Sequence, residues 1–185
     1  MSLLTEKALA ASLKKLLEKK TLNKITVRDI TDDCGVNRQT FYYHFHDVYD
    51  LVEWIFTQEA QKYLSNGIDA KNWREVISDL MDGLLEEKSF VMNAYYSLNR
   101  RQLEEFMQKL ARPAISDLVR QVEGARIISE EDLEFVIDIA TFSLVGIITE
   151  WVAGGMKPEY KEKLDRLFVL LDGTLEGMLD RVAKR

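Results

Sequence analysis

The sequence predicts an all-α protein of about nine helices, in which a three-helix head with a helix-turn-helix precedes a larger helical domain. Three observations support this prediction. Apolar residues recur three and four positions apart along most of the 185 residues. The chain contains only two prolines, Pro113 and Pro158, and no run of alternating apolar and polar residues indicates a strand. We therefore place the head at residues 1–47 and the helical domain at residues 48–185.

The first helix of the helix-turn-helix is expected to begin after Thr26, whose hydroxyl can accept a backbone N–H of the first turn. Val27, Ile30 and Cys34 then form one apolar stripe at helical spacing. Gly35 follows where the chain must leave the helix in a left-handed conformation, which glycine adopts without a Cβ penalty. These residues predict a short helix that ends in a tight turn.

The second helix is expected to begin after Asn37, which can cap it, and to bury Phe41 and Phe45, four positions apart. Its opposite face carries side chains that can form hydrogen bonds. A helix, a glycine turn and a second helix rich in donors are what a DNA-binding helix-turn-helix requires. The residues of this polar face are Arg38, Gln39, Thr40, Tyr42, Tyr43 and His44.

The segment from Ile25 to Leu51 resembles the N-terminal DNA-binding domain of TetR-family transcriptional regulators. The resemblance is carried by Ile25-Thr26, Gly35-Val36 and Thr40-Phe41-Tyr42-Tyr43-His44-Phe45. It implies a homodimer on double-stranded DNA, with operator half-sites about 34–36 Å apart, and control by a small ligand in the helical domain. The family usually has a phosphate-contacting lysine where this chain has Val48. Without the lysine, the backbone N–H groups at the N-terminus of the next helix can still bind a phosphate.

The polar face divides into side chains suited to base edges and side chains suited to phosphates. In the major groove Arg pairs with guanine and Gln with adenine, so the residues predicted to contact bases are Arg38, Gln39 and Tyr43. The resemblance implies phosphate contacts, which fix register without selecting sequence, for Thr26, Thr40, Tyr42 and His44. The predicted DNA-binding set also includes Asn37. It includes Arg28 as well, and Arg28 can contact either a base edge or a phosphate. The alternative for each side chain is a solvated surface, and for Tyr42 also partial packing.

A narrower resemblance, to the branch of the dihydroxyacetone-kinase operon activator DhaS, rests on two stretches. They are Arg38-Gln39-Thr40-Phe41-Tyr42 and Asp50-Leu51-Val52-Glu53-Trp54-Ile55-Phe56. This resemblance implies an alternative in which a partner protein docks on the helical domain and the output is activation. Repression is the more common output in the family. The sequence agrees with both alternatives.

The last two predicted helices carry apolar seams spaced 4-3-4-3-4, which favours helices packed side by side at a shallow angle. The first of them, from about 129 to 153, has a second apolar face with Phe135, Ile139, Phe142 and Val145. One face can therefore meet the same chain and the other a partner subunit, unless both seams are satisfied within one chain. The predicted dimer interface is Leu133, Ile137, Ala140, Leu144, Ile147, Trp151, Leu164, Phe168, Leu171, Leu175 and Met178.

Six aromatic side chains are candidates for the lining of a ligand pocket in the helical domain. Aromatic residues at helical spacing belong more often to a plain core, so packing is the alternative for each of them. The candidate pocket residues are Trp54, Tyr95, Tyr96, Phe106, Phe142 and Trp151.

Charge is distributed unevenly along a chain whose net charge is −6. Residues 1–50 carry eight Lys/Arg and seven Asp/Glu, whereas residues 51–185 carry 17 and 24. The N-terminal segment is therefore the part expected to face DNA, with the acidic remainder held away from the phosphates.

The sequence contains few groups that suit catalysis or metal binding. Its two histidines, His44 and His46, lie beside the DNA-facing helix, and neither a metal-ligand spacing nor a catalytic triad nor a phosphate loop is evident. We expect no metal, no cofactor and no enzymatic activity. A single cysteine, Cys34, and a start without a long apolar core predict a cytoplasmic protein. The most apolar stretch, Ala140 to Ile148, is expected to be too short for a membrane span. A helical adaptor without DNA binding is the alternative from another class.

Overall fold

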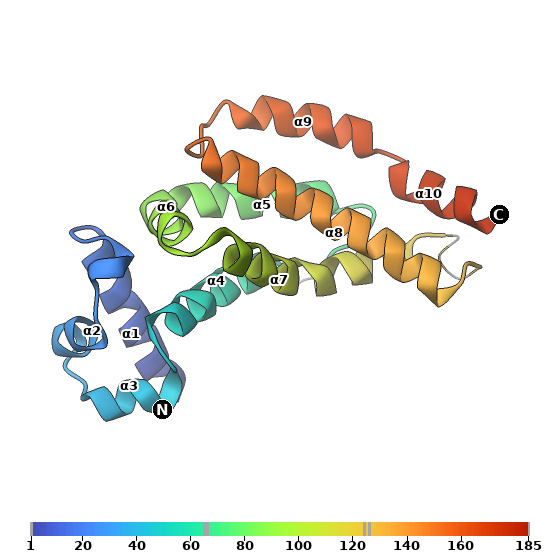
Figure 1. Cartoon of the computed structure of the whole chain (residues 1–185). Coiled ribbons are helices and arrows are strands. Elements are labelled where there is room, and N and C mark those ends of the chain that lie inside the picture. Colours follow the sequence, from blue (N-terminus) through green and yellow to red (C-terminus); the bar gives the residue numbers. More distant parts are fainter. Residues whose placement is uncertain (1, 65–66, 124, 126, 185) are drawn as a thin grey trace.

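The computed structural model describes residues 2–64, 67–123, 125 and 127–184, and every regular element within these ranges is a helix (Figure 1). The predicted all-α class is confirmed. The described ranges contain ten α-helices and one short 3₁₀ helix: α1 (Ser2–Leu17), η1 (Leu22–Lys24), α2 (Val27–Cys34), α3 (Arg38–His44), α4 (Val48–Leu64), α5 (Trp73–Glu86), α6 (Lys88–Ser97), α7 (Arg100–Gln121), α8 (Glu130–Ala153), α9 (Tyr160–Leu171) and α10 (Thr174–Ala183).

The helix-turn-helix is built by local hydrogen bonds that the sequence predicts. The backbone N–H of Asp29 donates to the Thr26 hydroxyl, and the Asp29 side chain accepts from the Thr26 backbone, which forms a capping box on α2. Gly35 ends α2 in the left-handed region, at φ 74°. The Asn37 side chain accepts from the backbone N–H of Thr40 and caps α3. These predictions of two caps and a glycine turn are confirmed.

The head has its own apolar core, which crosses the predicted boundary at residue 47. Leu13, Ile30 and Phe41 contribute fully buried side chains from α1, α2 and α3. The same cluster includes Leu51, Val52 and Ile55 of α4 and Phe90 and Ala94 of α6. The first helix of the body is therefore also a wall of the head.

Helix α4 leads from the head into the body (Figure 1). Its side chains serve two cores, because Ile55 is buried in the head cluster while Phe56 packs against both clusters. Further along the helix, Ala60 and Tyr63 line a cavity of the body. Any tilt of α4 therefore moves the head and the body together.

Helices α7 and α8 pack against each other along the body (Figure 1). Arg112 of α7 donates to Glu134 and Asp138 of α8, at 2.5 and 3.0 Å. Arg120 of α7 donates to Glu130 and Glu134 of α8, at 2.6 and 2.5 Å. The acidic first half of α8 thus faces arginines of α7, and α7 continues through Pro113 without a break.

The apolar stretch from Ala140 to Ile148 lies within the helix predicted from about 129 to 153, which the structure forms as α8. Helix α8 has 24 residues, so it is about 36 Å long at 1.5 Å per residue. By length and composition it is the one helix among the described residues that is able to cross a membrane. Its Ile137 and Val145 are buried within the protein, and Asp138 pairs with Arg112, as in the core helix of a globular domain.

The predicted single C-terminal helix is divided into α9 and α10. Gly173 takes a left-handed conformation at φ 68°, and the chain turns there. Asp172, just before the break, pairs with Arg74 of α5. The sequence also predicts a helix end at Ser65-Asn66-Gly67 and a helix interruption at Gly124. Of these, Ser65, Asn66 and Gly124 lie outside the described residues.

Removing the cap of α2 should weaken the head. Thr26→Ala is expected to lower the free energy of unfolding by about 1 kcal/mol, because a backbone donor of the first turn loses its partner. Urea denaturation followed by circular dichroism measures this change. Thr21→Ala is the matched control, since Thr21 precedes η1 without a side-chain cap and should change stability by less than about 0.5 kcal/mol. Equal losses in both variants would contradict the capping assignment.

The same cap makes the stability of the head depend on pH. The Thr26 hydroxyl and then Lys20 hold the pKa of the Asp29 carboxyl below its ordinary value of 3.8. A lowered pKa stabilises the fold above the unfolded-state pKa, and this contribution is lost as the pH falls through the folded-state pKa. Asp29→Asn should therefore lower the melting temperature at neutral pH, and the deficit should shrink in acid below 3.8. Thermal melts test this, with Asp32→Asn as the surface control; a deficit independent of pH would refute it.

Candidate DNA-binding face and internal cavities

The polar side of α3 is presented to solvent by two buried aromatic anchors. Phe41 and Phe45 are packed in the head core, with ring centroids 5.8 Å apart. On the opposite side Arg38 and Gln39 are exposed, and Tyr43 is 83% exposed. The three residues predicted to contact bases are thus accessible at the same time, on one short helix.

Two threonines predicted to hold phosphates are already engaged in caps. The hydroxyl of Thr40 donates to Asn37 Oδ1 at 3.0 Å, and the hydroxyl of Thr26 donates to Asp29 Oδ2 at 2.6 Å. A hydroxyl has one proton to donate. A phosphate contact by either residue therefore requires its hydroxyl to leave the cap.

The remaining predicted contact residues differ in accessibility. Tyr42 is exposed and lies edge-on against Phe41. Arg28 is exposed and pairs with Asp32, four residues along α2, at 3.3 Å. His44 is nearly covered, with a side chain only 7% exposed, and its Nδ1 lies 3.3 Å from Glu6 Oε1 on α1. The His44 ring therefore packs α3 against α1 and offers little surface to a phosphate.

The start of α4 is less suited to a phosphate than the sequence suggested. Val48 is half-buried against the head core. Asp47 accepts the backbone N–H of Asp50, and the Asp50 carboxylate accepts the backbone N–H of His46. The N–H group of Asp50 is therefore occupied, and two carboxylates lie where a phosphate would approach.

Two lysines of the head are paired with acids of α2. Lys15 donates to Asp33 at 2.6 Å, and Lys20 donates to Asp29 at 2.9 Å. These pairs connect α1 and the segment after it to the helix-turn-helix. They also neutralise part of the positive charge that the sequence places in the head.

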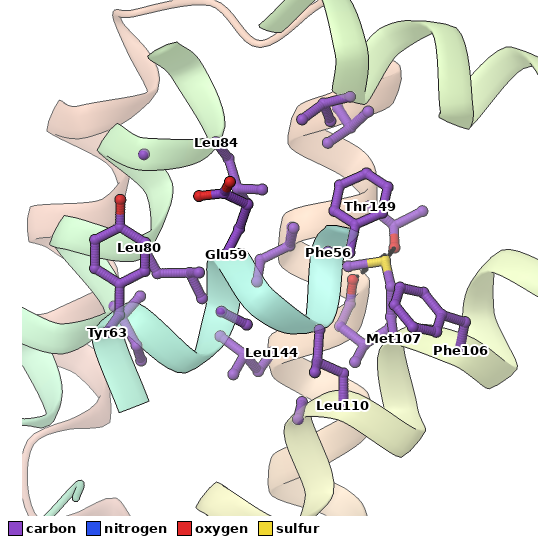
Figure 2. A pocket seen from close by; sticks show the side chains of 18 of the residues that line it. Phe56, Glu59, Tyr63, Leu80, Leu84, Phe106, Met107, Leu110, Leu144 and Thr149 are labelled. Carbon is purple, nitrogen blue, oxygen red and sulfur yellow. Dashed lines mark hydrogen bonds between the residues drawn. The ribbon is translucent and has the colours of Figure 1, made fainter. Parts of the chain in front are cut away.

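The body contains an internal cavity of about 120 Å³ lined by helices α4 to α8, called here the central cavity. Figure 2 shows its wall, where Phe56, Leu80 and Leu144 from three helices surround one space. The Thr149 hydroxyl points towards Met107 and lies 3.6 Å from its sulfur. Most of the lining is apolar, as is typical of a small-molecule site.

The central cavity includes two of the six aromatic residues predicted for a pocket. Tyr95 and Phe106 line it. The other four do not line it and lie elsewhere. Trp54 packs edge-on against Phe45 of the head, Trp151 is buried beside Tyr160, and two aromatics lie on the surface, namely Tyr96 and Phe142.

Two acidic residues that were not predicted form the polar edge of the central cavity, and one lysine pairs with both of them. Glu59 of α4 and Glu87, between α5 and α6, both line it. Lys14 of the head donates to Glu59 at 3.1 Å and to Glu87 at 2.8 Å, and its ammonium lies 5.6 Å from the centre of the Phe90 ring. These contacts join the head directly to the cavity wall.

The charges at this edge stabilise one another. Burial alone would lower the pKa of Lys14, but hydrogen bonds to Glu87 and Glu59 raise it above 10.5. Burial would likewise raise the pKa of Glu59, but Lys62 and Lys14 bring it below 4.5. At neutral pH Lys14 and Glu59 are therefore both charged in a partly desolvated place.

The seams predicted as a dimer interface face each other within one chain. Leu133, Ile137, Trp151, Leu164 and Phe168 are buried in the monomer, which contradicts the prediction for these side chains. The other six are incompletely covered: Ala140, Leu144, Ile147, Leu171, Leu175 and Met178. All six line a second space of about 150 Å³, called here the lateral cavity, whose wall is formed by α5, α7, α8, α9 and α10.

Three of the four residues on the second apolar face of α8 are incompletely covered, whereas Val145 is buried. Phe135 is 65% exposed and Phe142 is 55% exposed, with Ile139 half-buried between them. On α9, Val169 and Leu170 are exposed as well. Large apolar side chains gathered on one face mark an interaction surface.

Comparisons with known proteins agree with this architecture. Residues 9–54 match the bacterial regulatory proteins of the tetR family, and residues 71–173 match a transcriptional regulator C-terminal region. The HTH-type dhaKLM operon transcriptional activator DhaS of Lactococcus lactis subsp. lactis (strain IL1403) is 28% identical over 94 residues. This match spans 51% of the chain and 50% of that relative, so the chain matches about half the length of the relative.

A solved structure described as dihydroxyacetone kinase operon activator DhaS shares the fold. The match covers 97% of this chain and 98% of the DhaS chain, with a TM-score of 0.67 at 19% sequence identity. The helix-turn-helix and the helical body are thus matched by two parts of one family of regulators. The chain belongs to the TetR family of bacterial transcription regulators, whose members bind DNA as dimers.

Proposed function

We propose that this chain is a cytoplasmic, non-enzymatic regulator that binds a specific near-palindromic operator as a homodimer and responds to a small effector. Residues 1–47 provide the DNA-binding head in this proposal, and residues 48–185 provide the regulatory and dimerisation domain. One observation carries it: α3 presents Arg38, Gln39 and Tyr43 to solvent while Phe41 and Phe45 anchor it in a packed head.

The accessibility of the head residues supports a division of labour on DNA. Arg38, Gln39 and Tyr43 are proposed to contact base edges in the major groove. Tyr42 and Arg28 are proposed to hold phosphates, with Arg28 released from Asp32. The capping residues Thr26, Asn37 and Thr40 keep α2 and α3 in place and contact phosphates only as their hydrogen bonds allow. His44 is proposed to contact DNA only through the small exposed part of its ring.

The second face of α8 is proposed as the dimer surface, in place of the buried seams. Phe135, Ile139 and Phe142 lie at helical spacing on this face, and a second copy would cover them. In a C2 dimer the same face meets itself. Two heads held this way add their base contacts, which one short helix cannot supply alone.

The central cavity is proposed as the effector site, because its lining and the head share α4. Ile55 packs in the head while Phe56 and Tyr63 line the cavity. An effector that binds one tilt of α4 better than another shifts the equilibrium between the two head positions. The shift in free energy is no larger than the difference in its binding free energy for the two tilts. The cavity thus sets the spacing of the two heads in the dimer.

Activation of transcription is a second candidate output. The observation that favours it is the match to a relative named as a transcriptional activator. Repression is the alternative, since a protein of this design can block or recruit polymerase with the same DNA contacts. Control through a partner protein docked on the body would leave the central cavity empty and Phe56 unperturbed when the regulator responds.

Selection of bound duplexes from random DNA tests the DNA-binding proposal. We expect a near-palindrome, bound with an affinity that falls steeply between about 50 and 200 mM salt. Arg38→Ala should cost about 1–3 kcal/mol on the selected duplex and relax the preference at one base pair in each half-site. Fluorescence anisotropy on the selected and single-base-changed duplexes measures both effects.

Arg101→Ala is the matched control for this measurement, because Arg101 is an exposed arginine of α7 in the body. It should keep the affinity and the base preference. A double variant with Arg38→Ala and Tyr42→Phe that kept full affinity would instead support the helical adaptor without DNA binding.

The dimer surface is tested by placing a charge in it. Phe142→Glu should shift the protein from dimer to monomer and weaken operator binding, because two carboxylates would face each other in a desolvated contact. Sedimentation equilibrium measures the oligomeric state. Tyr96→Glu, at an exposed aromatic of α6, is the control and should stay dimeric. A dimeric Phe142→Glu protein would move the interface to another surface.

A further inference from the structure

The central cavity has a charged edge of one sign. Among its lining residues in the described part of the chain, the formally charged ones are Glu59 and Glu87, and no lysine, arginine or histidine is present. The rest of the wall is apolar apart from the hydroxyls of Tyr63, Tyr95 and Thr149 and the backbone. Figure 2 shows Glu59 among Phe56, Leu80 and Leu84. A ligand in this cavity therefore meets carbon over most of its surface and carboxylates at one edge.

Two lysines pair with these carboxylates, and neither lysine lines the cavity. Lys14 donates to Oε1 of both Glu59 and Glu87, and Lys62 pairs with Oε2 of Glu59. An anionic ligand would meet the carboxylates before it reached either lysine. A cationic ligand can instead donate to these carboxylates in place of Lys14, since a charged hydrogen bond to a partly desolvated carboxylate is strong.

The size of the central cavity limits the ligand. A cavity of about 150 Å³ holds one benzene molecule, and the central cavity has about 120 Å³. By this comparison one six-membered ring, or a short chain of similar size, fills the central cavity. The ring would occupy the apolar part, and a polar group on it would reach the edge at Glu59 and Glu87.

We propose that the effector is a small apolar cation, a protonated amine on one ring or short chain, that binds Glu87 and Glu59 in competition with Lys14. This inference rests on the proposed effector role of the central cavity and names the chemical class of its ligand. Because Lys14 belongs to α1, the competition also releases a contact between head and body. Binding of the cation and the position of the head are therefore linked.

Three singly substituted benzenes of nearly equal size test the proposal. Benzylamine is protonated at neutral pH, benzyl alcohol is neutral, and benzoate is an anion. Calorimetric titration of the full-length protein, in a buffer free of amines, should give benzylamine at least about tenfold higher affinity than benzyl alcohol, and benzoate the lowest. Equal affinities, or preference for the alcohol or the anion, would overturn the proposal. Absence of binding by all three would overturn it too.

Three variants separate the proposed contact from a general effect on folding. Glu87→Gln keeps the shape and removes the charge, so benzylamine should bind about tenfold more weakly while benzyl alcohol is unchanged. Lys14→Met removes the competitor, so benzylamine should bind more tightly than to the unmodified protein. A purely structural role for Lys14 would weaken or preserve binding. Glu86→Gln, at an exposed neighbour outside the cavity lining, is the control.

The outcome is distinguishable from failure of the proposed function. Binding to the selected duplex without any added compound tests the regulator alone. If the duplex is bound specifically and benzylamine shows no preference, the class of effector is wrong and the regulator stands. If benzylamine binds through Glu87 but no duplex is selected, the ligand assignment stands and the DNA-binding proposal fails. Circular dichroism of each variant confirms that it is folded.

Discussion

One helix is shared by two cores, and the rest of the structure depends on this constraint. Ile55 of α4 is buried with the helix-turn-helix, whereas Tyr63, two turns later, lies in the cavity of the body. Side chains in close-packed cores do not slide freely, so a shift of α4 at one end is transmitted to the other. Lys14 adds a second connection, from α1 to Glu59 of the same helix. Head and cavity are therefore mechanically continuous, although the sequence reads as two domains.

The head could be predicted almost completely from the sequence, because its structure is local. Capping by Thr26 and Asn37 and the turn at Gly35 depend on residues within four positions of each other. The polar face of α3 followed from the period of Phe41 and Phe45. The sequence did not reveal that His44 is covered by α1, since its neighbour Glu6 is far away along the chain. Nor did it reveal that Asp47 and Asp50 occupy the start of α4.

The body was predicted in class but not in its contacts. The 4-3-4-3-4 seams of α8 and of α9 with α10 are real, but periodicity does not say whether a seam meets its own chain or another. Gly173, which divides the last helix, was a signal that the seam has to turn. The exposed face with Phe142 could have been chosen from its pattern, because a helix with two apolar faces needs two partners. The central cavity is assembled from five helices, so no short stretch contains it. The one signal in the sequence for this cavity was Glu59, a charged residue on α4 between the apolar Ile55 and the aromatic Tyr63.

The most direct test of this continuity is the distance between the two heads in the dimer. Nitroxide labels at an Asp32→Cys position, in a Cys34→Ser background, can be measured by electron–electron double resonance on the operator duplex. We expect one narrow distance between the two labels on DNA, and a different distance when benzylamine fills the central cavity. The same distance in both states, with the probe shown to be bound, would contradict the claim that the cavity and the head move together.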